Sequence, residues 1–148
     1  MHLYDLFKEY YKSPPTTRVR ILKGKPIETI RFTSRQKSCF TQLHILFYST
    51  GKKIVPLNIG EFLTPMGLAY WAMDDGNKQG SGFHLNTHGF TQEEVNLLSK
   101  VLLEKFNLIN SIQYHNNGYR IYIFTESINK FRILVIEHFH ESIKYKLY

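Results

Sequence analysis

Residues 64–76 read T-P-M-G-L-A-Y-W-A-M-D-D-G, and this stretch decides the fold of the chain. Thr64 is a residue type that caps helix N-termini, and Pro65 suits the first helical position, where an N–H would have no partner. Gly76 is the usual residue just past a helix end. We therefore predict a helix between Thr64 and Gly76 that ends on the acidic pair Asp74-Asp75.

Small side chains recur along this predicted helix at steps of four, three and four residues: Pro65, Ala69, Ala72 and Gly76. Such a stripe predicts close packing against a second helix, which would bring the acidic pair close to whatever that helix carries. An amphipathic helix that ends in an Asp-Gly turn is the alternative. This stretch alone leaves both interpretations open.

The whole chain has 148 residues and a formal net charge of +7, which predicts one domain-sized unit with a polyanionic partner, most simply nucleic acid. Its single cysteine, Cys39, excludes an internal disulfide and a cysteine-rich zinc module. Because Cys39 lies in an apolar helical stretch, we expect a buried thiol.

No apolar run is long enough for a membrane span, and the first twelve residues are too charged for a signal peptide.

Two extended runs flank Lys23-Gly24-Lys25 near the N-terminus. Residues Val19, Ile21, Ile30 and Phe32 alternate with arginines and threonines, which predicts a hairpin with one apolar and one basic face. The basic face is either a nucleic-acid-binding surface or simply a solvated one. A helix is then predicted from Ser34 to Tyr48.

After residue 76 the pattern predicts a strand over residues 81–87, preceded by a strand that is very short or lost. Thr91 and Glu94 form a capping-box pattern at the start of a helix. An Asn117-Gly118 turn predicts a hairpin that pairs Tyr114 with Ile121, and Ser127 is expected to cap the last helix. The predicted class is α+β, and residues before 64 partly repeat the same order.

The residues Leu68 to Gly76, L-A-Y-W-A-M-D-D-G, resemble the LAGLIDADG motif of homing endonucleases. Further stretches resemble the branch of that family in which one chain carries two motifs: residues 52–56, 63–66, 85–95 and 145–147. The resemblance implies a helix-strand-strand-helix-strand-strand-helix unit, with a saddle-shaped antiparallel sheet covered by helices on one face.

On this resemblance, residues 63–148 form a complete domain of that type, and residues 1–62 form the rear part of a first, incomplete domain. No earlier motif with its own aspartate precedes Leu63 in the sequence given. The resemblance therefore predicts a fragment, one half of a split enzyme or a decayed gene product. Alternatively, two copies or a partner chain pair through the 64–76 helix.

The resemblance also implies a site-specific, Mg²⁺- (or Mn²⁺-) dependent DNA endonuclease of the intron-homing type. Asp75 would be the catalytic, metal-binding carboxylate, and the carbonyl of Asp74 would help to hold the ion. Lys53 and Lys146 match lysines near the active site of the family; solvated surface lysines are the alternative. One Asp75 would supply half of a double-strand cutter, because each scissile phosphate needs its own ion.

Several polar residues are predicted to contact DNA, at base edges or at phosphates, because their side chains suit those groups. They are Arg18, Arg20, Arg31, Lys78, His84, Asn86, Gln113, His115 and Arg120. Two other functions stay open: an RNA-binding intron splicing cofactor (maturase), which would not need Asp75, and a non-cleaving DNA-binding module. Abundant residues with AT-rich codons, such as Phe and Tyr, indicate an organelle genome, mitochondrial or plastid; an AT-rich bacterium is the alternative.

Overall fold

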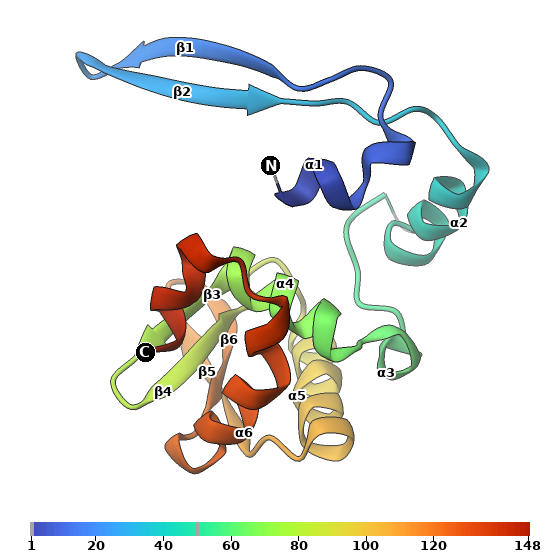
Figure 1. Cartoon of the computed structure of the whole chain (residues 1–148). Coiled ribbons are helices and arrows are strands. Elements are labelled where there is room, and N and C mark those ends of the chain that lie inside the picture. The colour runs from blue at the N-terminus through green and yellow to red at the C-terminus, as the bar shows by residue number, and fades with distance from the viewer. Residues whose placement is uncertain (1, 50) are drawn as a thin grey trace. The chain divides into compact units, whose positions relative to one another are not determined.

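The computed structural model describes residues 2–49 and 51–148. They fall into two compact units, Met1–Ile45 and Leu46–Tyr148 (Figure 1). The sequence-based division after residue 62 lies further along, because Val55 and Ile59 are buried in the core of the second unit. Val55 and Ile59 therefore pack with the elements that follow them.

The second unit has the predicted α+β order. Its elements are α3 (Ile59–Phe62), α4 (Pro65–Asp75), β3 (Gly76–Gln79), β4 (Gly82–Asn86), α5 (Gln92–Phe106), β5 (Asn110–His115), β6 (Gly118–Ile123) and α6 (Thr125–Val135). Two 3₁₀ helices follow, η2 (Ile136–His138) and η3 (Glu141–Leu147). The strand expected to be very short or lost is β3, which has four residues and follows α4 directly. This order confirms the helix-strand-strand-helix-strand-strand-helix unit.

The four strands form one antiparallel sheet in the order β3-β4-β6-β5, and α4, α5 and α6 lie on one of its faces (Figure 1). The side chains of Phe83 and Leu85 on β4 and of Ile121 and Ile123 on β6 are buried under these helices. Because side chains alternate along a strand, the residues between them point to the opposite face. We call this opposite face the outer face of the sheet.

The β5–β6 hairpin differs from its predicted register. Its turn residues are Asn116 and Asn117, with φ of 49° and 60°, so both adopt the left-handed conformation that two-residue hairpin turns need. Tyr114 therefore pairs with Tyr119, and the predicted pairing with Ile121 is wrong. Each partner moves by two positions, which leaves every side chain on its predicted face.

The helix α4 begins as predicted, because the Thr64 hydroxyl accepts a hydrogen bond from the Gly67 N–H at 3.1 Å. Its end differs from a usual glycine stop, since Gly76 has φ −98° and ψ 152°, which is extended backbone. Residue 76 must be glycine because there is no room for a side chain. A Cβ at residue 76 would lie 2.4 Å from the Ala72 carbonyl oxygen and 2.5 Å from the Phe83 ring.

The helix α4 packs against a second helix, α6, as well as against its own sheet. Ala69 and Ala72 are completely buried in the core of their own unit, and Gly76 contacts Phe83 of β4. The small side chains let α4 approach its own sheet and α6 closely. The side of α4 left open carries Met66, which is 39% exposed, and ends at Asp74.

Two predicted helix starts have different outcomes. The capping box of α5 is confirmed: the Glu94 N–H donates to the Thr91 hydroxyl at 3.3 Å, and the Thr91 N–H donates to the Glu94 carboxylate at 2.7 Å. Ser127 does not cap the last helix, because α6 already begins at Thr125. Its buried hydroxyl instead accepts from the Ile109 N–H at 2.8 Å and links α6 to the segment before β5.

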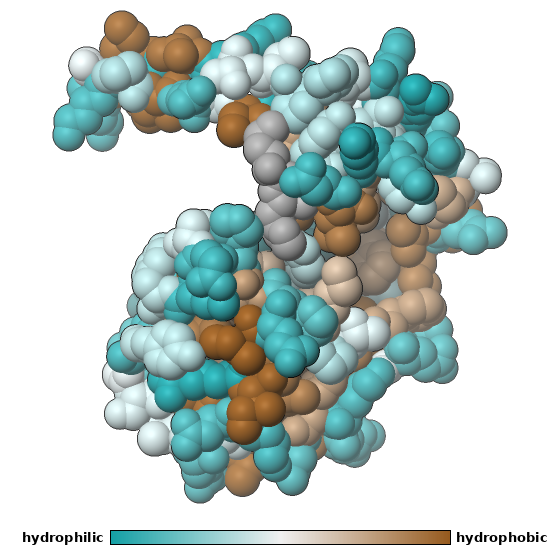
Figure 2. All heavy atoms as spheres, viewed as in Figure 1, coloured by the Kyte–Doolittle hydropathy of each residue, from teal (hydrophilic) through white to brown (hydrophobic). Residues whose placement is uncertain are grey.

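The first unit contains α1 (His2–Leu6), the 3₁₀ helix η1 (Lys8–Tyr10), β1 (Thr16–Leu22), β2 (Lys25–Arg31) and most of α2 (Ser38–Phe47), whose last two residues fall in the second unit. The β1–β2 hairpin has the predicted faces, with Arg18 opposite Thr29 and Val19 opposite Glu28. Its apolar face is not covered within the unit, since Val19 is 67% and Ile21 is 75% exposed (Figure 2).

The helix predicted from Ser34 starts four residues later, at Ser38. Ser34 instead forms a bridge with Tyr11, and the Arg35 N–H donates to the Tyr10 carbonyl at 2.7 Å, so these residues continue the extended chain. Cys39 on α2 is exposed, which corrects the expected buried thiol. Within the described residues, no helix combines the length and the apolar character that crossing a membrane requires.

Candidate functional site

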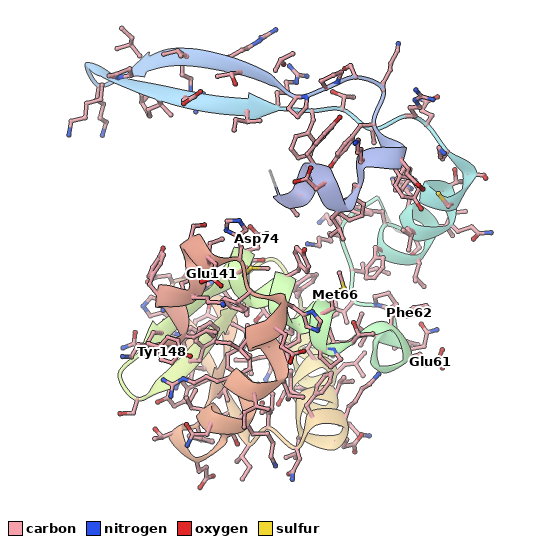
Figure 3. All side chains as sticks on the ribbon, viewed as in Figure 1. Glu61, Phe62, Met66, Asp74, Glu141 and Tyr148 are labelled. Atoms are coloured by element: carbon pink, nitrogen blue, oxygen red, sulfur yellow. The ribbon has the colours of Figure 1, made fainter. Side chains whose placement is uncertain are left out.

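Two carboxylates stand at the C-terminal end of α4. Asp74 and Asp75 are its last two residues, and both are exposed; Figure 3 labels Asp74 at this end of the helix. Both line a cavity of about 350 Å³ together with Lys53, Trp71 and other residues of the second unit. The cavity therefore joins the predicted acidic pair to one of the two predicted lysines.

The end of α4 is held from two sides. The last carbonyls of a helix have no partner within it, and they form the negative end of the helix dipole. Lys146 Nζ, from η3, donates to the Met73 carbonyl at 2.7 Å. Asn86 Nδ2, from β4, donates to the Asp75 carbonyl at 2.9 Å. The carbonyl between these two belongs to Asp74, the group that the family resemblance assigns to the metal.

Lys53 reaches the cavity because its segment is tied to α5. The Val55 N–H donates to Glu94 Oε1 at 2.9 Å, so the glutamate of the capping box binds the segment that carries Lys53. The Lys53 ammonium lies 5.7 Å from the centre of the Phe90 ring. Glu94 thus links the start of α5 to the wall of the cavity.

The donor set at this end of α4 fits a hard divalent cation. Carboxylate and carbonyl oxygens are the ligands that Mg²⁺ and Mn²⁺ prefer, and Mg²⁺ keeps several waters when it binds proteins. Within residues 2–49 and 51–148, no three His, Cys, Asp or Glu side chains gather as a metal site. Asp74 and Asp75 therefore fit an ion that takes only part of its ligands from them.

The outer face of the sheet is polar and partly buried. His84 is only 2% exposed, and its Nε2 lies 3.0 Å from Gln113 Oε1. Burial lowers the pKa of His84 below its ordinary value of 6.5; the hydrogen bond to Gln113 raises it in part, and nearby Arg120 and His115 lower it further. Over the described part of the chain, neither His84 Nδ1 nor Arg120 Nε has a hydrogen-bond partner.

The structure brings five of the predicted DNA-contacting residues onto this outer face: His84, Asn86, Gln113, His115 and Arg120. Lys78 lies elsewhere, because it pairs with Phe83 and shares the helix-covered face of the sheet. There it lines a cavity with residues of α6. Arg18, Arg20 and Arg31 share one face of the β1–β2 hairpin in the first unit.

Sequence reasoning missed several contributions to the site. Tyr122, between the buried Ile121 and Ile123, lies on the outer face, where its ring stands 5.1 Å from His84 and fills the space next to Gly82. The alternation of β6 predicts this face, although the list of predicted DNA contacts omits Tyr122. The bonds of Asn86 and Glu94 to distant backbone groups carry no such signal, because a residue's type does not show its long-range partner.

Comparison with known proteins agrees with this geometry. The model of the LAGLIDADG DNA endonuclease family matches residues 1–131. The probable intron-encoded endonuclease 1 of Wickerhamomyces canadensis is 36% identical, over 99% of this chain and 67% of that protein. The cytochrome b mRNA maturase bI2 of Debaryomyces hansenii is 35% identical, over 90% of this chain and 52% of that protein.

A solved structure of the homing endonuclease I-WcaI bound to its DNA recognition sequence resembles this fold with a TM-score of 0.91 and 35% identity. The likeness covers 99% of this chain and 69% of that one. The chain thus spans about half the length of the Debaryomyces relative and about two thirds of the other two. The family match, the relatives and the fold agree, and this chain belongs to the LAGLIDADG DNA endonuclease family.

Proposed function

We propose that this chain acts as a site-specific DNA endonuclease of the intron-homing type, which uses Mg²⁺ or Mn²⁺ to hydrolyse phosphodiester bonds within a long recognition site. One observation carries the proposal: the cavity at the end of α4 joins Asp74, Asp75 and Lys53. Phosphodiester hydrolysis needs an activated water and neutralisation of charge at the phosphate, and these groups suit both needs.

Each group at the end of α4 has a proposed role. The Asp75 carboxylate holds the divalent ion, with the Asp74 carbonyl beside it; when bound, such an ion polarises a phosphoryl oxygen and lowers the pKa of a bound water. The Lys53 ammonium offsets the negative charge that develops on the scissile phosphate. Lys146 is already bonded to the Met73 carbonyl, so it keeps the helix end in place beside the reacting groups.

We propose the outer face of the sheet as the surface that contacts DNA bases. Amide, imidazole and guanidinium groups suit base edges in the major groove. The unpartnered, buried His84 Nδ1 and Arg120 Nε support a polar ligand on this face, because buried polar groups are normally hydrogen-bonded. The net charge of +7 favours a polyanion. Arg18, Arg20, Arg31 and Lys78 remain proposed contacts, most simply to phosphates.

A double-strand break requires a second carboxylate site. One Asp75 serves one scissile phosphate, so the other comes from a second copy of this chain or from another polypeptide segment. The open side of α4, which carries Met66, is the proposed contact for that partner. The relatives called intron-encoded endonuclease and cytochrome b mRNA maturase support an origin in an organellar intron.

The test is Mg²⁺-dependent cleavage of a supercoiled plasmid that carries the intron-less target locus. We expect Asp75→Asn to abolish cleavage and to leave DNA affinity in the absence of metal within about twofold, because the ion ligand is lost and the outer face is unchanged. Glu93→Gln, which removes one exposed negative charge from the first turn of α5, is the matched control and should cleave like the wild type. Cleavage by Asp75→Asn at the wild-type rate would overturn the proposal.

A second candidate function is assistance in splicing an intron RNA. The maturase name of the Debaryomyces relative favours it, and the same basic chain would bind RNA. Splicing does not need the ion held by Asp75. Wild-type splicing by Asp75→Asn, together with tight binding of the intron RNA, would support this function; the absence of RNA binding would exclude it.

A further inference from the structure

Asn86 joins the outer face of the sheet to the end of α4. It is the last residue of β4 and pairs with Arg120 of β6. On its other side, the β3–β4 ladder starts with Gly76 opposite Leu85, so the next pair would be Asp75 opposite Asn86. Asp75 is still helical, so its backbone does not pair with that of Asn86. The Asn86 side chain connects the two residues instead, because its Nδ2 donates to the Asp75 carbonyl at 2.9 Å.

The amide nitrogen of Asn86 is fully used in hydrogen bonds within the protein. Its Nδ2 also lies 3.3 Å from Asn77 Oδ1, so both of its hydrogens have acceptors within the protein. Only the carbonyl oxygen of the amide remains for an outside ligand. A residue that reads adenine through a bidentate amide needs its N–H groups as well, so this geometry does not favour Asn86 as a reader of base edges.

The bond acts on the residue that carries the proposed metal ligand. Lys146 holds the Met73 carbonyl, two residues earlier, and fixes the helix but not its last peptide. The Asn86 bond fixes the carbonyl of Asp75 itself, at the step where the backbone changes from helix to the extended conformation of Gly76. A bond at this step sets how the Asp75 carboxylate is directed relative to the outer face.

We propose that Asn86 is a positioning residue that holds Asp75, and with it the cation site, in register with the DNA-contacting face of the sheet. This inference rests on the proposed endonuclease function. Partners of metal ligands typically contribute about 10- to 100-fold to metal affinity or activity, and we expect an effect of about tenfold here because the bond is to the backbone of the ligand residue.

The test uses Tb³⁺, an oxygen-binding cation whose luminescence is sensitised by a nearby tryptophan. Trp71 is the only tryptophan of the sequence; it lines the same cavity as Asp75 and lies one helical turn before it. Three variants of the full chain are compared with the wild type: Asn86→Leu removes the donor at similar size, Asn86→Gln keeps an amide donor, and Asn96→Leu is a control on the exposed surface of α5. Asp75→Asn serves as the variant without the proposed ligand.

We expect Asn86→Leu to weaken Tb³⁺ binding about tenfold and to lower the cleavage rate at saturating DNA about tenfold. The metal-free DNA affinity and the melting temperature of Asn86→Leu should stay close to wild type. Asn86→Gln should recover part of the lost Tb³⁺ affinity and part of the lost cleavage rate. Asn96→Leu should change neither the Tb³⁺ affinity nor the cleavage rate. These results would separate positioning from DNA binding, since they change the rate and the metal affinity but not the affinity for DNA.

Three other results would overturn the proposal. Unchanged Tb³⁺ binding, with DNA affinity lost at particular base pairs, would make Asn86 a base-contacting residue. A joint fall in melting temperature, DNA affinity and Tb³⁺ binding would make it a structural residue only. Wild-type protein that neither binds Tb³⁺ nor cleaves would overturn the proposed function and this role with it, whereas a failure confined to the Asn86 variants leaves the proposed function intact.

Discussion

Gly76 is the residue at which packing, rather than backbone conformation, requires glycine. Its φ of −98° suits any residue, but an added Cβ would meet the Ala72 carbonyl oxygen and the Phe83 ring at 2.4 and 2.5 Å. We expect Gly76→Ala to lower the free energy of unfolding by about 1–3 kcal/mol, because α4 must move away from β4. Urea denaturation measures this change.

Gly89→Ala is the matched control for this prediction. No atom lies within 4 Å of a Cβ added at Gly89, so we expect a change within about 0.5 kcal/mol. Equal stability of the two variants would show that Gly76 does not set the distance of α4 from β4.

His84 predicts a dependence of stability on pH. Burial is the main cause of its lowered pKa in the folded protein, so below about pH 6.5 the unfolded chain binds a proton that the folded chain does not. The contribution of neutral His84 to stability is thus complete above that pH and is lost as the pH falls from there toward the folded-state pKa. The free energy of unfolding of the wild type should fall more between pH 8 and pH 5 than that of His84→Gln, and the other histidines cancel in this difference.

Urea unfolding of both proteins across this pH range measures the effect, and parallel curves would contradict it. Arg120 and His115 supply the positive charges near His84 on the outer face. A variant of Arg120 should therefore reduce the difference between wild type and His84→Gln only in part.

At the scale of single residues, local chemistry was predictable and long-range partners were not. The caps Thr64 and Thr91 act within three residues, so their roles follow from the sequence alone. Asn86 meets Asp75 only because β4 returns beside the end of α4, and Glu94 meets Val55 across 39 residues. A pattern of residue types along the sequence does not show which distant residues come into contact in the folded chain.

At the scale of elements, Glu94 predicts a coupling between α5 and the segment that carries Lys53. Its two carboxylate oxygens accept from the N–H groups of Thr91 and Val55, whereas the Thr91 hydroxyl serves only the helix start. We expect Thr91→Ala to cost about 1 kcal/mol of stability, and Glu94→Ala to cost more because two backbone donors lose their acceptor.

The same pair of variants separates stability from function. Glu94→Ala should also slow cleavage, since it releases the Lys53 segment from the cavity wall, while Thr91→Ala should leave the rate unchanged. Urea denaturation and single-turnover cleavage measure the two effects. Equal rates for both variants would show that Lys53 does not depend on this link.

The elements of the second unit were predictable because their patterns are strong, but their exact pairings were not. The alternation of β4 and β6 assigned the correct residues to the core. The Asn116-Asn117-Gly118 sequence allows a two-residue turn at Asn116-Asn117 or at Asn117-Gly118. The preference for Asn-Gly favours the second position, but the left-handed conformation of both asparagines shows that the turn is at the first. The stripe of Ala69 and Ala72 likewise shows that something packs closely, but not which element it is.

At the scale of the whole molecule, the buried apolar core belongs to one unit. Every buried hydrophobic residue of the described chain lies between Val55 and Leu147. The first unit is held instead by aromatic contacts, such as Tyr11 with Phe32 at 4.6 Å, and by a hairpin whose strands are exposed along nearly their whole length. Two-stranded hairpins without a covered face are marginally stable in water.

This distribution predicts two levels of protection in hydrogen exchange. Amides of β1 and β2 should exchange much faster than those of β4 and β6, although all four strands are in antiparallel ladders, because only β4 and β6 are covered by helices. Low urea should release the remaining protection of the first unit before that of the second.

Adding target DNA should slow exchange in β1 and β2 if Arg18, Arg20 and Arg31 bind it, since binding stabilises the bound state by mass action. Equal protection of the β1–β2 and β4–β6 strand pairs in the free chain would contradict the marginal stability of the first unit. Unchanged exchange in β1 and β2 on saturation with DNA would exclude the basic face of the first unit as a contact surface.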